Sequence, residues 1–276
     1  MGETGIEDNI LEKIAAYTRE RVKMQKRLVP EEELKARILE RAARENGPEF
    51  PFEKAFRGED IHIISEVKHA SPSKGLITLE FPYLRIARDY EKGGAAAISV
   101  LTEPKWFRGD LEFLREIAES VSCPCLRKDF VVDPYMIYEA RAAGAQAILL
   151  ITAILTDSEL ALYLDLCEAM KLSALVECHD ETEIHRALAA GARVIGVNNR
   201  NLKDFSVDLK NSQRLRDQIP DNVIMIAESG IKSRKDIEIL ASYGVNGVLI
   251  GETLMTATDR VQKLEELRGV REVIEA

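Results

Sequence analysis

Acidic and basic side chains recur at the ends of short apolar runs along this chain. Glu66 and Lys68 stand two positions apart at the end of one run, which places both side chains on one face of a strand. Comparable positions after later runs hold Lys128, Glu177, Asn198, Arg200, Glu228 and Ser229. Each residue alone is more often a solvated loop residue. Together they form a set of acids and bases suited to proton transfer in a pocket.

Two loops supply candidate phosphate contacts, AESGI and LIGETLM. Gly230 and Gly251 would let backbone N–H groups approach an anion closely, and Ser229 would add a hydroxyl group. An isolated glycine of this kind is usually a simple turn residue. The phosphate hypothesis therefore depends on where the fold places the two loops.

A repeated pattern explains how these residues could be brought together. Polar segments with helical spacing end at Gly94, Gly144, Gly191 and Gly244, and a continuous apolar run follows each one. Glycine suits the left-handed position that ends a helix. An unbroken apolar run is typical of a parallel strand covered on both faces. The pattern predicts helices that alternate with parallel strands.

Eight such runs predict strands that end near Val67, Leu101, Lys128, Ile151, Glu177, Asn198, Glu228 and Gly251. Each interval has room for one loop, one helix and one strand, and eight such units close a barrel. We therefore predict an α/β fold, a TIM (β/α)8 barrel that forms a single domain over residues 1–276. Two smaller domains or a doubly wound sheet would also suit the length, but KHASPSKG lacks the glycine fingerprint that follows the first strand of such a sheet.

The barrel does not require residues 1–60, which we interpret as an N-terminal helical extension with two additional helices. Ile10, Ile14 and Tyr17 have helical spacing, and Pro30 followed by three glutamates suits the first turn of a second helix. A plug below the barrel and a lid over the substrate fit this pattern equally well.

Composition excludes several classes of function. The 276 residues carry a net charge of -9, which argues against a nucleic-acid partner. The longest apolar stretch, AQAILLITAIL, is too short to cross a membrane. Four cysteines and the lack of a leader favour a reduced, cytoplasmic setting. The histidines lack metal-ligand spacing, and His179 is interpreted as a loop residue, so no metal site is expected.

Seven motifs resemble the successive strand-end motifs of the indole-3-glycerol-phosphate synthase family: ISEVKHASPSKG, SVLTEPKWFRG, LRKDFVVDPYMIYEARAAGA, ALVECHDE, IGVNNRNL, AESGI and GVLIGETLM. The resemblance implies a carboxy-lyase of tryptophan biosynthesis that acts on a phosphosugar, 1-(2-carboxyphenylamino)-1-deoxyribulose 5-phosphate. It closes a ring, releases carbon dioxide and water, and leaves an indole. The resemblance implies no metal or organic cofactor and allows association with other enzymes of the pathway.

The resemblance gives catalytic roles to Glu66, Lys68, Lys128, Glu177, Asn198, Glu228 and Ser229. Lys128 resembles the general acid at the substrate ketone, and Glu177 resembles a base in the dehydration. Lys68 resembles a second proton donor. Whether Lys128 and Glu177 or Lys68 and Glu66 carry out the dehydration stays open.

Substrate contacts are expected from Ser71, Phe107, Phe130, Arg200, Leu202, Gly230, Gly251 and Glu252. Phe107, Phe130 and Leu202 could hold the benzene ring, and Arg200 is placed to meet the substrate carboxylate. Glu252 stands where some family members have serine. The phosphate must then be bound by backbone N–H groups, with the Glu252 side chain turned away.

Two other functions are compatible with a barrel. Another phosphosugar enzyme, such as a phosphoribosylanthranilate isomerase, would share phosphate loops but would not need Lys68, Lys128 and Glu177 together. A catalytically silent barrel that serves as a partner subunit would lack some of the acids and bases at its strand ends. None is missing here.

Overall fold

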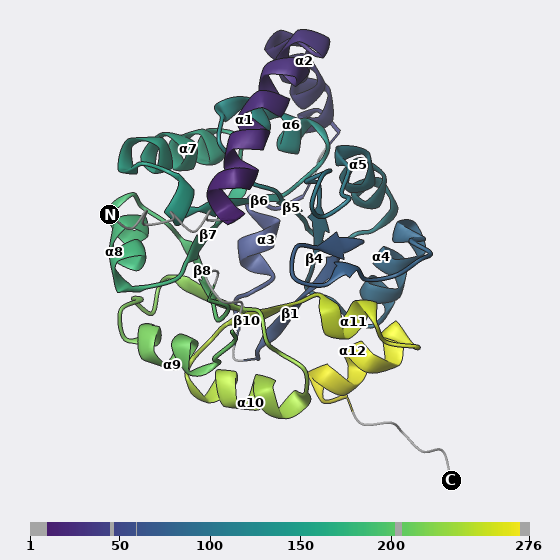
Figure 1. Cartoon of the computed structure of the whole chain (residues 1–276), viewed down its shortest axis with the longest axis vertical. Coiled ribbons are helices and arrows are strands. Elements are labelled where there is room, and N and C mark those ends of the chain that lie inside the picture. Colours follow the sequence, from purple (N-terminus) through teal and green to yellow (C-terminus); the bar gives the residue numbers. More distant parts are fainter. Residues whose placement is uncertain (1–9, 45–46, 59, 202–205, 271–276) are drawn as a thin grey trace, which may run out of the picture.

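The computed structural model describes residues 10–44, 47–58, 60–201 and 206–270. Eight parallel strands close into a barrel in the order β1-β10-β9-β8-β7-β6-β5-β4 (Figure 1). The barrel strands are β1 (His62–Val67), β4 (Ala97–Leu101), β5 (Cys125–Lys128), β6 (Ala147–Ile151), β7 (Ser173–Cys178), β8 (Val194–Asn198), β9 (Ile224–Glu228) and β10 (Gly247–Ile250). The predicted TIM-barrel fold is confirmed.

The strand ends agree closely with the prediction, because each continuous apolar run forms one barrel strand. β7 continues through Cys178, and β10 ends at Ile250, so these two ends differ from the prediction by a single residue. The loop after β1 contains a short antiparallel hairpin that was not predicted, β2 (Ala70–Ser71) with β3 (Gly75–Leu76).

Helices surround the barrel, as Figure 1 shows. They are α4 (Tyr83–Lys92), α5 (Leu111–Ser120), α6 (Pro134–Ala142), α7 (Asp157–Ala169), α8 (Glu181–Ala189), α9 (Lys210–Arg216), α10 (Arg234–Ser242), α11 (Glu252–Met255) and α12 (Arg260–Arg268), with a 3-10 turn at Thr152–Ile154. The four predicted helix-ending glycines all have positive φ, as at Gly94 (85°) and Gly144 (94°). Glycine adopts this conformation without a Cβ clash. None of the described helices is both long and apolar enough to span a membrane.

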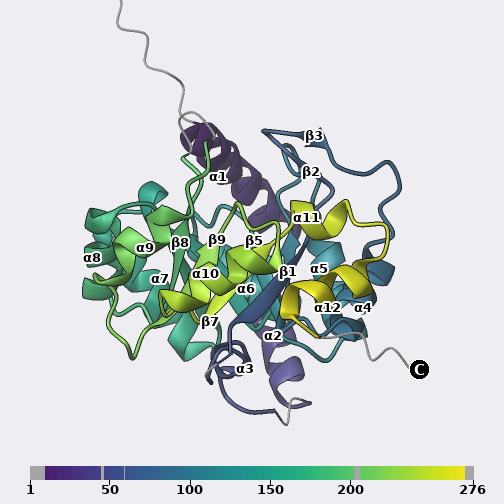
Figure 2. The same cartoon turned by 90° about the horizontal axis from the view of Figure 1, so that it is seen from below.

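The N-terminal extension contains both predicted helices, α1 (Ile10–Leu28) and α2 (Glu31–Ala42), and a third that was not predicted, α3 (Pro51–Lys54). The prediction of only two helices was therefore incomplete, since α3 is too short to show a helical repeat. Figure 2 shows α1 and α3 at opposite ends of the barrel. Phe52 and Phe56, at α3, are buried in the cluster that fills the barrel interior. The extension thus supplies both a plug, α3, and a cover at the other end, α1.

Apolar side chains fill two layers, which explains why the strands are apolar on both faces. Ile64, Leu126 and Leu175 point into the barrel interior, whereas Ile63 and Ile98 pack in the larger cluster between the barrel and its helices. With both strand faces covered, the acidic side chains that the strands carry, Glu66, Glu177 and Glu228, lie at or next to the carboxyl ends.

Candidate active site

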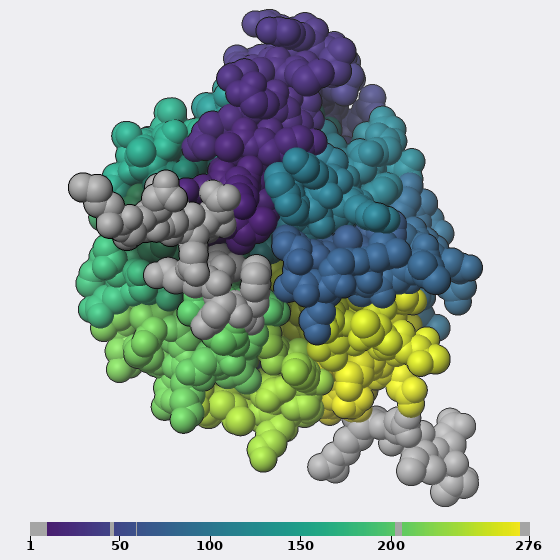
Figure 3. Space-filling view, in the orientation of Figure 1, coloured from purple at the N-terminus to yellow at the C-terminus, as the bar shows by residue number. Residues whose placement is uncertain are grey.

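A cavity of about 750 Å³ lies at the carboxyl ends of the barrel strands. Its lining includes Glu66, Lys68, Ser71, Phe107, Lys128, Phe130, Glu177, Asn198, Arg200, Glu228, Ser229, Gly230, Gly251 and Glu252. These are all of the predicted site residues except Leu202, which lies outside the described residues. Figure 3 shows α1, in purple, lying across this face of the barrel. The topology brings the predicted residues together because parallel strands present their carboxyl ends at one mouth.

Lys128 lies at the centre of the charged groups. Its Nζ is 2.9 Å from Glu228 Oε2 and 3.4 Å from Glu177 Oε2. Burial opposes the ammonium charge, but the surrounding carboxylates outweigh burial and raise the pKa of Lys128. The side chain is therefore a largely buried cation held between two carboxylates.

The second lysine is paired within its own strand end. Lys68 donates a hydrogen bond of 2.6 Å to Glu66 Oε1. Burial works against ionisation of Glu66, but Lys68 and Lys128 outweigh it and lower the pKa of the carboxyl group. Gly251 packs against this pair, since a Cβ atom there would lie 2.5 Å from Glu66 Oε1 and 3.0 Å from Lys68 Nζ. Glycine at residue 251 therefore makes room for the ion pair.

The Glu177 carboxylate is held from more than one side. Asn198 Nδ2 donates a hydrogen bond of 3.3 Å to Glu177 Oε1, while the other oxygen faces Lys128. Burial disfavours the charge, but Lys128 and His179 outweigh it and lower the pKa of Glu177 to about 2. Asn198 Oδ1 in turn accepts a hydrogen bond of 3.0 Å from the backbone N–H of Arg200.

The loop after β9 has an unusual backbone. Ser229 has φ of 68° and Gly230 has φ of 86°, so two consecutive residues adopt the left-handed conformation. A non-glycine residue in this region is uncommon, and such residues cluster at functional sites. Ser229 and Gly230 line the cavity together with Gly251 from the loop after β10. The two predicted phosphate loops are therefore neighbours.

Glu252 lies in the first turn of α11 and pairs with Lys74, whose Nζ is 3.2 Å from Glu252 Oε1. Lys74 belongs to the hairpin loop after β1 and also lines the cavity. Both side chains are about half exposed, so solvent screens the pair. The carboxylate thus has a cationic partner of its own beside the candidate phosphate loops.

Aromatic and aliphatic side chains form the apolar wall. The rings of Phe107 and Phe130 have centroids 6.1 Å apart, and the start of α1 adds Ile10, Leu11 and Ile14. Sequence reasoning recognised the helical spacing of Ile10 and Ile14 but not their place in the site. A pattern of apolar residues shows that one helix face is buried, not which surface it covers.

A buried ion pair that sequence reasoning missed connects α1 to the site. Arg21 donates two hydrogen bonds, of 2.9 and 2.8 Å, to the carboxylate of Asp129, the residue that follows Lys128. Asp129 also accepts bonds from Thr102 and Arg127. The only available signal was an aspartate next to a candidate catalytic lysine.

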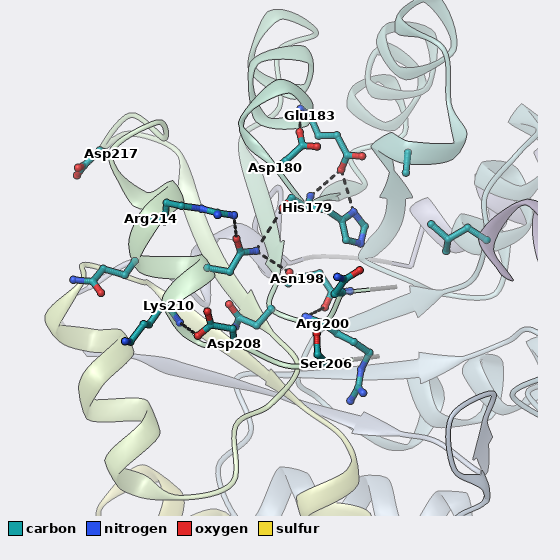
Figure 4. Close-up of a pocket in the computed structure, with 16 residues that line it drawn as sticks. His179, Asp180, Glu183, Asn198, Arg200, Ser206, Asp208, Lys210, Arg214 and Asp217 are labelled. Atoms are coloured by element: carbon teal, nitrogen blue, oxygen red, sulfur yellow. Dashed lines mark hydrogen bonds and ion pairs between the residues drawn. The ribbon is translucent and has the colours of Figure 1, made fainter. Parts of the chain in front are cut away.

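A second cavity, of about 850 Å³, adjoins the first between β7, β8 and α9 (Figure 4). Asn198 and Arg200 line both cavities. His179 and Glu183 lie on the wall of the second cavity, where Figure 4 shows them in contact. Among the described residues, no cluster of histidine, cysteine and acidic side chains suits a metal ion.

Comparisons with known proteins agree with this geometry. A family model described as indole-3-glycerol phosphate synthase matches residues 11–267. A protein of that name from Leuconostoc mesenteroides is 54% identical over 223 residues, which are 80% of this chain and 85% of that protein. Another from Lacticaseibacillus casei is 50% identical over 253 residues, 92% of this chain and 96% of that protein.

Solved structures with low sequence identity share the fold alone. A 3-hexulose-6-phosphate synthase aligns with a TM-score of 0.60 at 16% identity and covers 76% of this chain and 99% of its own. A thiamine phosphate pyrophosphorylase from Pyrococcus furiosus aligns with a TM-score of 0.56 at 18% identity, over 76% and 94% of the two chains. The family match over nearly the whole described chain and the half-identical relatives are decisive: this chain belongs to the indole-3-glycerol phosphate synthase family.

Proposed function

We propose that the chain converts 1-(2-carboxyphenylamino)-1-deoxyribulose 5-phosphate into indole-3-glycerol phosphate, carbon dioxide and water. The observation that carries this proposal is the contact of Lys128 with both Glu177 and Glu228 inside a cavity that also holds Lys68 and Glu66. The names of the half-identical relatives support the same reaction.

Ring closure is the first step. The aromatic carbon that bears the carboxylate is a weak nucleophile, so the ketone must be polarised as negative charge develops on its oxygen. Lys128 performs this role, because the carboxylates around it keep it charged before substrate arrives. As the carbon–carbon bond forms, the ketone oxygen takes a proton from Lys128 and becomes a hydroxyl group.

Loss of carbon dioxide follows, since the bond to the carboxylate breaks and its electron pair returns to the ring. In the dehydration, the new hydroxyl group leaves as water after receiving a proton, and a base removes a proton from the adjacent carbon. Two pairs could supply this acid and base, Lys128 with Glu177 and Lys68 with Glu66. The variants Glu177→Gln and Glu66→Gln distinguish the two pairs. The variant that lacks the dehydration base should accumulate the decarboxylated intermediate that still carries the hydroxyl group.

Substrate binding involves the cavity residues that take no part in proton transfer. We assign the benzene ring to Phe107 and Phe130, the substrate carboxylate to Arg200, and the phosphate to the loops at Gly230 and Gly251. These assignments are supported by their positions around one cavity. Backbone N–H groups in glycine-containing loops after the last two strands are common phosphate ligands in such barrels.

We further propose that residues 1–276 form one (β/α)8-barrel domain, with residues 1–60 as its helical extension, and that the protein acts in the cytoplasm. All four cysteines are free, and three are buried, as is usual where thiols stay reduced.

We also propose association with other enzymes of tryptophan biosynthesis. Co-purification from a cell extract tests this association.

The direct test is incubation of the protein with the carboxyphenylamino-deoxyribulose phosphate while indole fluorescence and carbon dioxide release are followed. Both signals should rise together in equal amounts. Phosphoribosylanthranilate serves as the control substrate, because an isomerase would consume it. Consumption of the control without indole formation from the first substrate would overturn the proposal.

A further inference from the structure

His179 lies directly after β7 with its ring between two carboxylates. Nε2 is 3.3 Å from Glu177 Oε1, and Nδ1 is 3.0 Å from Glu183 Oε2. Glu183 also accepts a hydrogen bond of 2.8 Å from the backbone N–H of His179 (Figure 4). The side chain is only 18% exposed. His179 is thus a loop residue, as the sequence indicated, but its ring is hydrogen-bonded to Glu183 and lies at ion-pair distance from Glu177. Among the described residues, Nε2 has no partner with hydrogen-bond geometry, so the contact with Glu177 is one of charge.

These contacts fix the orientation of the Glu177 carboxylate group. One carboxylate oxygen faces Lys128, and the other faces Asn198 and His179. We propose that His179, held by Glu183, is a positioning residue that fixes the Glu177 carboxylate against Lys128. This inference rests on the proposed function, because it assumes that Glu177 takes part in the reaction.

The charges of the site support this role. Burial disfavours a charged imidazole, but Glu177 and Glu183 outweigh burial and raise the pKa of His179 to about 10. The groups that face Glu177 from the other strands are Lys128 on β5, Asn198 on β8, Glu228 on β9 and Glu66 on β1. His179 therefore adds a positive charge beside the three carboxylates Glu66, Glu177 and Glu228. Lys68 and Lys128 supply the other positive charges that act on them.

The first experiment compares His179→Leu with His179→Gln. The leucine variant loses both the ring contact and the charge, and kcat should fall by up to about 10²-fold, the cost of a misplaced catalytic group, with little change in KM. Glutamine keeps an N–H donor within reach of Glu177 and should restore most of kcat. In both variants the acidic limb of the kcat profile should move to higher pH by about one to three units, because a positive charge near Glu177 is lost.

The second experiment tests whether Glu183 acts through His179. Glu183→Gln keeps an oxygen for the backbone N–H of His179 but removes the charge, so kcat should fall less than in His179→Leu. In the His179→Leu background, Glu183→Gln should cause no further loss. His185→Gln is the matched control, since His185 is exposed on α8, and its activity should equal that of the parent.

All variants are first compared with the parent by far-UV circular dichroism and Tm, so that a loss of folding is recognised. An unchanged acidic limb in the well-folded His179→Gln variant, together with kcat within twofold of the parent in His179→Leu, would overturn the positioning role. Additive losses in the double variant would overturn the part assigned to Glu183. If the parent forms no indole, the proposed function fails instead.

Discussion

Lys128 Nζ lies 2.9 Å from Glu228 Oε2, yet the second oxygen of the same carboxylate, Oε1, is buried without a hydrogen-bond partner among the described residues. Gly196 on β8 makes this possible, because a Cβ atom there would collide with Glu228 Oε1. Burial raises the pKa of Glu228 to about 7 despite the nearby ammonium group. A carboxyl group in this state can exchange a proton near neutral pH.

The raised pKa of Glu228 predicts a specific pH dependence of stability. A carboxyl group that holds its proton more tightly when folded contributes stability below its unfolded pKa, and this contribution is lost as the pH rises from about 4.5 to about 7. Glu228→Gln should remove that part of the decline, which is measured as Tm against pH. Glu40→Gln, at an exposed position on α2, should follow the parent. Parallel curves for Glu228→Gln and the parent would contradict the prediction.

Lys128→Met should lower kcat by at least about 10²-fold, since it removes the acid that polarises the ketone. The variant also leaves Glu177 and Glu228 without their shared cation, so its Tm should fall and must be measured alongside activity. Lys92→Met changes an exposed lysine on α4 and should leave kcat unchanged. Turnover of Lys128→Met within a few-fold of the parent would disprove the assigned role.

Glu177→Gln keeps the shape of the side chain but cannot accept a proton. We expect kcat to fall by about 10²- to 10⁴-fold at every pH from about 6 to 9, because the base is absent at any pH. Glu181→Gln, at an exposed position on α8, is the control. If kcat of Glu177→Gln matches that of the parent throughout this range, Glu177 is not the base.

Gly251→Val should raise KM for substrate and weaken competition by inorganic phosphate. The added side chain would meet Glu66 and Lys68 as well as close the approach to the backbone, so kcat should also fall. Glu252→Ser should change KM only modestly, because its carboxylate faces Lys74 and is about half exposed. A crystal structure with phosphate bound away from the loops at Gly230 and Gly251 would refute the phosphate placement.

Arg21→Met should loosen α1 from the barrel. It removes two charge-assisted hydrogen bonds to the buried Asp129, which predicts a loss of about 2 kcal/mol in the free energy of unfolding. Because α1 places Ile14 in the cavity wall, KM should rise more than kcat falls. Denaturant unfolding and steady-state kinetics provide the two measurements. Arg19→Met, an exposed neighbour on the same helix, should alter neither, and equal behaviour of the two variants would contradict the role of Arg21.

The strands and the site residues at their ends could be predicted because one physical cause produces both. A parallel strand covered on two faces is largely apolar until it reaches the mouth, so Glu177 and Glu228 each mark both a strand end and the cavity wall. Arg127 is an exception, because it lies one residue before the end of β5 and pairs with Glu139 on α6 instead of lining the cavity. Lys128 and Glu228 belong to strands far apart in sequence, yet barrel closure alone was enough to predict that they converge.

Contacts of individual side chains could not be predicted in this way. Arg21 meets Asp129, and His179 meets Glu183, but neither pair has a periodic pattern that specifies a partner. α3 is only four residues long, less than two helical turns, so its apolar residues show no repeat. Hairpin β2–β3 likewise has two residues in each strand. Short elements and long-range ion pairs depend on the assembled fold rather than on local sequence.

The pairing of β1 with β10 also has a consequence for protein synthesis. In the finished barrel, Ile63 pairs with Val248 and Ile64 with Leu249, yet the ribosome delivers β1 long before β10. Until β10 emerges, the edges of β1 and β9 that it will join lack their partner, and an unpaired edge can recruit other chains. The ion pair of Glu66 and Lys68 gains its neighbour Gly251 only at that moment. The barrel and its active-site mouth can therefore close only after β10 has been synthesised.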